Sequence, residues 1–147
     1  MLRRILISLF TLMVLPISLS AQITLIPMDE TQTDHLKAYG IAFKALEMGR
    51  TVEWLLNYRA GSFVFDADPE LDNLCLIRGV YAEHINSADL ADIYRVIEVE
   101  NMERVMLEKA PAIAVYSPQN VEPWDDAVML ALTYADIKYD MIWDEEV

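Results

Sequence analysis

The sequence predicts an α/β fold, namely a Rossmann-like three-layer sandwich with a mostly parallel sheet, preceded by a signal peptide. Short apolar, β-branched runs alternate along the chain with segments of helical period, as in right-handed βαβ units. Hydrophobic residues make up 54% of the chain, which is enough to build a core. The acidic residues are dispersed rather than blocked, so a folded domain is expected and a disordered chain is not.

The first 21 residues have the features of a secretory signal. Arg3 and Arg4 precede an apolar run over residues 5–19, and Ser20 and Ala21 supply small residues for cleavage. The run is shorter than the ~20 residues of a comfortable membrane span. We therefore expect a cleaved signal peptide (1–21), an α/β domain (22–147) and a periplasmic or extracellular location, with an uncleaved anchor as the alternative.

Strands are expected where short β-branched runs stand between turn signals, at residues 23–26, 52–56, 63–65, 80–85, 112–116 and 137–143. Helices are expected at residues 34–48, 69–79, 87–98 and 125–135, and a break at 99–101 precedes a further helical piece that contains Val105 and Met106. Gly49 and Gly79 are suitable helix stops, and Asp68–Pro69 is a typical helix start. The 125–135 helix is apolar nearly all round, which predicts cover on more than one side.

Charge and cysteine content limit the partners of the domain. The first 21 residues hold two of the 11 basic residues and none of the 24 acidic ones, so the remainder carries 9 − 24 = −15. Such a field repels phosphate backbones and anionic lipid, so neither nucleic acid nor a membrane surface is an expected partner. Cys75 is the only cysteine, which excludes an internal disulfide, and its apolar neighbours predict a buried thiol.

A candidate ligand site follows from the expected parallel sheet. Ligands bind such sheets at the carboxyl ends of the strands, where three polar loops (29–35, 57–62 and 117–126) would meet. There, Arg59 could pair the carboxylate of a small polar ligand. The predicted ligand-binding residues are Asp29, Thr31, Asp34, His35, Asn57, Arg59, Ser62, Trp124 and Asp125. Each also has a structural interpretation, such as helix capping by Asp34 and Asp125.

No catalytic, metal or cofactor motif is present in the sequence. GxGxxG, the P-loop, HExxH and GxSxG are all absent, so no catalytic residue, metal ligand or cofactor is predicted. Ser62 and Ser117 are loop hydroxyls without an evident base. Asp66, Asp68, Glu70 and Asp72 have part of the spacing of a calcium loop, but the glycine and the bidentate glutamate are missing, and helix capping is the simpler interpretation.

Three segments carry a family resemblance: residues 25–40 (LIPMDETQTDHLKAYG), 54–59 (WLLNYR) and 123–128 (PWDDAV). They resemble exported bacterial proteins commonly labelled asparagine synthetase B, whose members are considerably longer than this chain. The resemblance implies a class I amidotransferase-like or flavodoxin-like α/β architecture. Taken literally, the label implies glutamine-dependent amidation of aspartate. The N-terminal cysteine and the SGGxDS-like loop of that chemistry are absent from this chain.

The function that the sequence favours is an exported small-polar-ligand binding or scaffold module. It would be the N-terminal part of a longer protein, and the missing C-terminal part of the same chain would be its partner. The alternatives are an amidotransferase-like enzyme with catalytic groups beyond Val147 and, ranked last, a glutamine-dependent asparagine synthetase.

Overall fold

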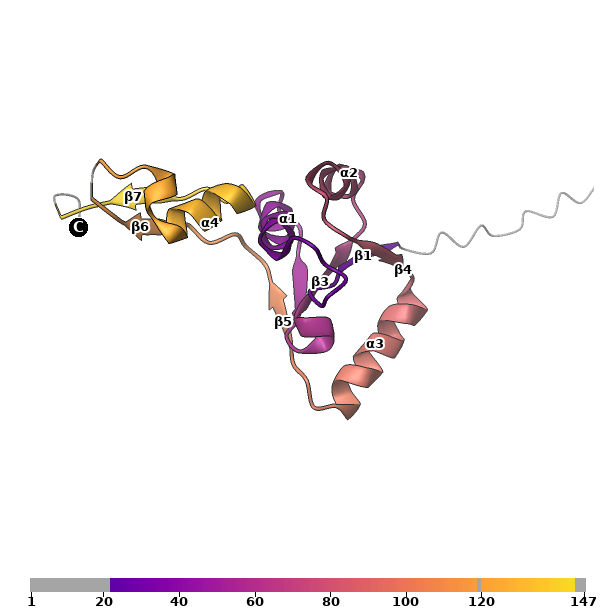
Figure 1. The fold of residues 1–147 in the computed structure, drawn as a ribbon. Coiled ribbons are helices and arrows are strands. Elements are labelled where there is room, and N and C mark those ends of the chain that lie inside the picture. Colours follow the sequence, from indigo (N-terminus) through magenta and orange to yellow (C-terminus); the bar gives the residue numbers. More distant parts are fainter. Residues whose placement is uncertain (1–21, 119, 145–147) are drawn as a thin grey trace, which may run out of the picture.

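The computed structural model describes residues 22–118 and 120–144, so the expected signal peptide lies outside the described residues. Seven strands, four α-helices and two 3₁₀-helices follow one another in this part of the chain (Figure 1). In order they are β1 (Ile23–Ile26), α1 (His35–Glu47), β2 (Val52–Leu55), η1 (Tyr58–Ala60), β3 (Ser62–Asp66), α2 (Pro69–Arg78), β4 (Glu83–Ile85), α3 (Ser87–Val99), β5 (Arg104–Leu107), β6 (Ala114–Tyr116), η2 (Pro123–Asp125), α4 (Ala127–Ala135) and β7 (Asp140–Ile142).

The main sheet is antiparallel, so the predicted mostly parallel Rossmann-like sheet is wrong. Its strand order is β4-β1-β3-β2-β5, and each neighbouring pair runs in opposite directions. Helix α1 does connect two strands of the same direction, β1 and β2, but β3 is inserted between them. Helix α2 likewise connects β3 and β4 across β1. These interlocked crossovers form the split βαβ, or ferredoxin-like, arrangement, to which α3 and β5 are added.

Helices cover both faces of this sheet, which explains why its central strands are apolar without a clean alternation. On one face α1 and α2 pack on Ile26, Val52, Phe63 and Phe65. On the other face α3 packs through Ile93 and Ile97 on Ile23, Leu25, Leu55 and Val64. Figure 1 shows α1 and α2 on one side of the sheet and α3 on the opposite side. We call residues 22–107 the body.

One helical prediction fails within the body. Val105 and Met106 belong to strand β5, which pairs with β2, and not to a helical piece. The break before it is real, because α3 ends at Val99 and Asn101 has a left-handed φ of 53°. Asp126, rather than the expected Asp125, caps α4, and Asn86 caps α3.

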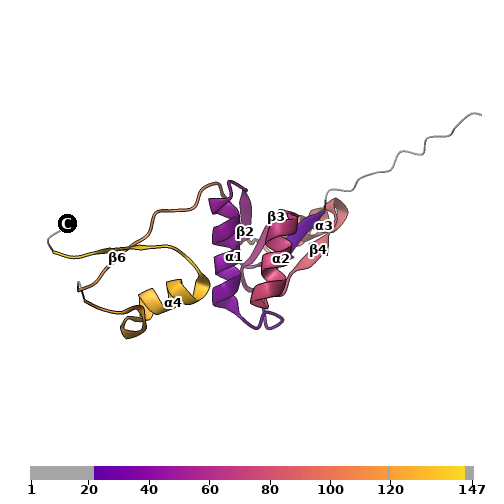
Figure 2. The same ribbon diagram turned by 90° about the horizontal axis from the view of Figure 1, so that it is seen from above.

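A second, smaller unit follows the body. Strands β6 and β7 form a separate two-stranded parallel sheet, and α4 is the crossover between them. Figures 1 and 2 show this unit extending away from the body on the α1 side, with α4 next to α1. We call β6, η2, α4 and β7 the C-terminal unit. Parallel pairing, predicted for the whole chain, occurs only here within the described residues.

Candidate functional site

Two of the three predicted loops meet at one end of the main sheet. Because β1 and β2 run in the same direction, the loop after β1 and the β2–β3 hairpin lie at the same edge. A backbone hydrogen bond from the Met28 amide to the Arg59 carbonyl joins them at 3.1 Å. The third loop follows β6, in the C-terminal unit, and therefore belongs to a different sheet.

Arg59 is the centre of the polar cluster at this edge. Its Nε donates to Asp29 Oδ2 at 2.6 Å, its Nη1 to Glu83 Oε1 at 2.8 Å, and its Nη2 to Thr31 Oγ1 at 3.1 Å. The guanidinium thus ties the β1–α1 loop and the β2–β3 hairpin to β4. A ligand carboxylate would have to compete with Asp29 and Glu83 for the same donors, so Arg59 serves the fold in this geometry.

The backbone of the β2–β3 hairpin has an unusual conformation that positions the Arg59 side chain. Arg59 and Ala60 have φ values of 46° and 64°, and Gly61 follows at 102°. A left-handed conformation costs a residue other than glycine roughly 1–2 kcal/mol. The side-chain hydrogen bonds of Arg59 offset that strain, because they form only when the guanidinium points back to the β1–α1 loop.

The electrostatics of the cluster agree with its geometry. Hydrogen bonds from the Arg59 guanidinium and from the Thr31 hydroxyl hold the pKa of Asp29 well below its usual range. Hydrogen bonding to Asp29, and more weakly to Glu83, outweighs burial and raises the pKa of Arg59. Both groups are therefore charged throughout the physiological range.

The other predicted residues in these two loops have structural partners or lie exposed. Asp34 caps α1 by accepting from the Lys37 amide, and His35 Nε2 donates to the Met28 carbonyl at 3.0 Å. The Ser62 hydroxyl is buried and donates to the Tyr58 carbonyl at 3.0 Å. Asn57 precedes η1, is exposed and makes no side-chain cap.

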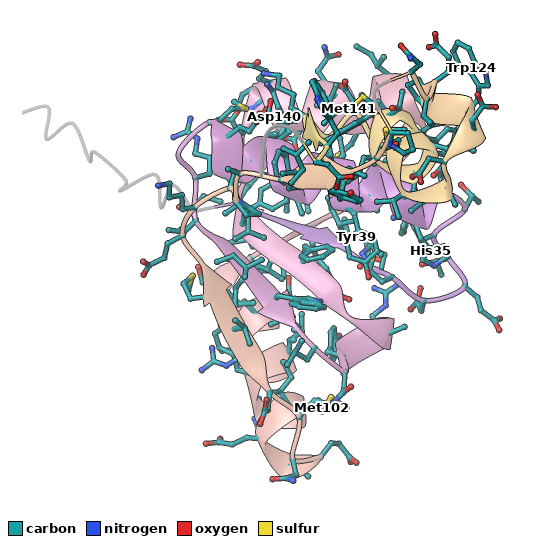
Figure 3. The ribbon with its side chains drawn as sticks, turned by 90° about the vertical axis from the view of Figure 1, so that its left-hand side faces the viewer. His35, Tyr39, Met102, Trp124, Asp140 and Met141 are labelled. Atoms are coloured by element: carbon teal, nitrogen blue, oxygen red, sulfur yellow. The ribbon has the colours of Figure 1, made fainter. Side chains whose placement is uncertain are left out.

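Trp124 and Asp125 do not join the Arg59 cluster. Both lie in η2 and are exposed, and Figure 3 shows Trp124 at the outer edge of the C-terminal unit, away from His35. The contact between the two regions is instead made by α4. Its Tyr134 hydroxyl donates to Asp34 Oδ2 at 2.5 Å, and Lys37 Nζ lies 4.8 Å from the centre of the Tyr134 ring.

A polar cluster that the sequence analysis did not find lies on the α3 face of the sheet. Glu53 of β2 is 9% exposed, and Arg104 of β5 donates to its Oε1 from Nη1 at 2.9 Å. The Tyr94 hydroxyl of α3 donates to Glu53 Oε2, and the Arg104 guanidinium carbon lies 3.9 Å from the centre of the Tyr94 ring. Burial, together with the hydrogen bond to Glu53, raises the pKa of Tyr94 to about 12.

This cluster separates two cavities. One, of about 350 Å³, is lined by Glu53, Tyr94, Ile97, Glu98, Met102, Arg104 and Met106. The other, of about 140 Å³, shares Glu53, Tyr94 and Met106 and extends toward Asp66. Both cavities lie beside α3, and Glu53, Tyr94 and Met106 line both of them.

One signal for this site was present in the sequence. Glu53 is a charged residue inside the apolar run Val52–Leu55, where a strand with both faces covered would place it in the core. Its partners stand 41 and 51 residues further along the chain. No local pattern indicates that pairing, because it depends on the strand order.

Other reactive side chains do not form a site. Among the described residues, no three His, Cys, Asp or Glu side chains lie close enough to hold a metal ion. Asp68 of the calcium-like run caps α2 and pairs with Arg50 at 2.6 Å, and Asp72 accepts from Thr24 at 3.0 Å. Cys75 is buried, as predicted, and its burial raises its pKa to about 11.

No family model matches this chain, and no curated protein and no solved structure matches it either. The body is ferredoxin-like in the order and direction of its strands. Within residues 22–118 and 120–144, no helix is both long and apolar enough to cross a membrane.

Proposed function

We propose that this chain is exported and serves as a scaffold module, whose body holds the C-terminal unit in place for completion by a further parallel α/β segment of the same protein. The observation that carries the proposal is the two-stranded parallel sheet of β6 and β7. Parallel strands are normally buried on both faces within larger sheets. Here Val115 is the one buried residue of the two strands, and Tyr116 is 60% exposed.

Helix α4 supports the same interpretation. Its sequence is almost entirely apolar, yet only Met129 and Ala135 are buried, while Val128, Leu130 and Tyr134 are each about half exposed. α4 uses one side against α1 and leaves the others open. A helix of this composition is normally covered on more than one side.

The body holds α4 firmly although it does not cover it. An ideal Cβ on Gly40 of α1 would lie 1.9 Å from the Ala135 carbonyl oxygen, so only glycine permits this approach. Arg78 at the end of α2 donates to Asp136 Oδ2 and to the Tyr134 carbonyl, both at 2.9 Å. These bonds satisfy a terminal carbonyl of α4 and place a positive charge at its C-terminus.

A segment of the same chain is a better occupant than a second copy. The chain carries a net charge of −13, and two copies at one interface would repel each other. The amidotransferase-like alternative is compatible with the same geometry, because β6, α4 and β7 form a βαβ unit, which is the repeating unit of parallel α/β domains. Its catalytic groups would then come from the completing segment.

Backbone amide hydrogen exchange tests the scaffold proposal, comparing the 147-residue chain with the product of the complete open reading frame. We expect β6 and β7 to exchange much faster than β1 and β3 in the 147-residue chain, and slowly in the longer product. Equal protection of β6 and β3 in a monomeric 147-residue chain would contradict the proposal. So would a reading frame that stops after Val147, or protection that appears only when the chain dimerises in sedimentation.

A further inference from the structure

The larger cavity between α3 and β5 is open to solvent and contains a fixed guanidinium. Arg104 is stacked on Tyr94 and held by the buried Glu53. The hydrogen bond to Glu53 uses Nη1, and Nε and Nη2 of the same planar group make no hydrogen bond to the residues that the structure describes, so this edge can face a second carboxylate. An arginine held in this way is preorganised for bidentate carboxylate binding, because its side-chain freedom is already restricted.

Charge and apolar surface restrict the ligand further. Glu53 and Arg104 compensate each other, so Glu98 gives the cavity a net negative charge. A purely anionic ligand such as phosphate would bind Arg104 but would be repelled by Glu98. Ile97, Met102 and Met106 supply an apolar wall, and Figure 3 shows Met102 at the turn from α3 into β5.

We infer that this cavity binds a small zwitterion, whose carboxylate pairs with Arg104, whose ammonium group faces Glu98 and whose short aliphatic body packs on the two methionines. A volume of about 350 Å³ accommodates a molecule of this size. The site lies in the body and uses none of the residues that hold α4. A test of this site is therefore independent of a test of the proposed scaffold function.

Three probes of the same shape test the ligand class by isothermal titration with the full chain: leucine, 4-methylpentanoate, which lacks the ammonium group, and 3-methylbutylamine, which lacks the carboxylate. We expect leucine to bind at least about tenfold more tightly than either analogue, since each loses one charge-assisted contact. Equal binding of 4-methylpentanoate would reduce the site to an anion site. Equal binding of 3-methylbutylamine would mean that the cavity is only a cation site. Absence of leucine binding would mean that the cavity does not bind this class of ligand. Each of these results would overturn the inference.

Matched variants locate the binding. Glu98→Gln should weaken leucine binding about tenfold or more, whereas Glu100→Gln, at the end of the same helix but outside the cavity, should leave it unchanged. Arg104→Lys keeps the charge beside Glu53 but loses the planar fork, so it should also weaken binding, while Arg95→Lys should not. Because Glu98 is exposed, Glu98→Gln should fold normally. Equal affinities in Glu98→Gln and Glu100→Gln would place the ligand elsewhere.

Discussion

The body and the C-terminal unit are made of the same kinds of element but differ in how completely those elements are covered. In the body, all of β1 and four of the five residues of β3 are buried between helices on both faces. In the C-terminal unit, Val115, Met129 and Ala135 are the buried apolar side chains among the described residues. Such a difference assigns the stability of this chain to the body, because burial of apolar surface is the main favourable term in folding.

The same comparison shows what the contact between the two regions does. α4 is joined to α1 through Gly40 and the Asp34–Tyr134 hydrogen bond, and to α2 through Arg78. These contacts lie at one side of α4 and close to its C-terminal end. The body therefore fixes the position of the C-terminal unit, but the C-terminal unit is less stable than the body. Three experiments can separate placement from stability.

The largest effect is expected from truncating matched leucines in the two regions. Leu25 in β1 is 1% exposed, whereas Leu130 in α4 is 49% exposed. Leu25→Ala should lower the free energy of unfolding by about 2–5 kcal/mol, because it removes buried contacts and leaves a cavity. Leu130→Ala should change it by less than about 1 kcal/mol.

Urea unfolding followed by far-UV circular dichroism measures both variants, with the slope against urea compared to confirm the same cooperative transition. A large loss in Leu130→Ala would show that α4 is covered in solution, for instance by a second copy. It would also show that the two regions unfold as one unit.

A smaller and more local effect is expected from Gly40→Ala. The added Cβ would meet the Ala135 carbonyl oxygen, so α4 has to move away from α1. Alanine is the better helix former by about 1 kcal/mol, so α1 itself should not be weakened. Hydrogen exchange should accelerate in α4, β6 and β7 while β1 and β3 stay protected.

Ala42→Gly in the same helix is the matched control for Gly40→Ala. It changes the helix propensity of α1 by a similar amount in the opposite direction and removes a buried methyl group, without adding an atom at the contact with α4. If Gly40→Ala left exchange in α4 unchanged, the close approach of the two helices would not exist in solution. If it unfolded the body as well, the contact would be part of the core.

The difference between the regions also explains how far sequence patterns predicted this fold. Alternation of strands and helices reports the direction of successive strands, and β1 and β2 do run in the same direction. It does not report which strands are neighbours, and β3, which follows η1 in the chain, is inserted between them. A local sequence pattern carries no information about that insertion. The predicted parallel sheet was therefore wrong, although most helices and strands lie close to their predicted positions.

The candidate sites follow the same rule. Asp29, Thr31 and Arg59 were expected to lie together because β1 and β2 were expected to be parallel, and that relation survives in the antiparallel sheet. Trp124 was expected with them, but β6 pairs with β7 alone. Glu53 and Arg104 meet only because β5 adds beside β2 at the end of the sheet, which no spacing in the chain indicates.

The smallest effect is expected from two carboxylates with lowered pKa values, one within the body and one between the regions. Hydrogen bonds from Arg59 and Thr31 lower the pKa of Asp29. Partial burial opposes the shift at Asp34, but the bonds from Tyr134 and Lys37 outweigh it and lower the pKa there too. A carboxyl group with a lowered pKa in the folded state stabilises the fold above about pH 4, and that stability is lost as the pH falls through the folded value.

Acidification should therefore weaken the body through both groups, and only Asp34 should also affect α4. From pH 6 to pH 3, Asp29→Asn should flatten the fall in the unfolding free energy of the body, because the neutral amide has no ionised form to lose. Asp34→Asn should flatten that fall as well, because Asp34 caps α1 of the body, and should in addition accelerate hydrogen exchange in α4 already at pH 6, since the charged acceptor of Tyr134 is removed. Identical effects of the two variants on both measurements would mean that the C-terminal unit and the body form one cooperative structure, and the separation of placement from stability would be wrong.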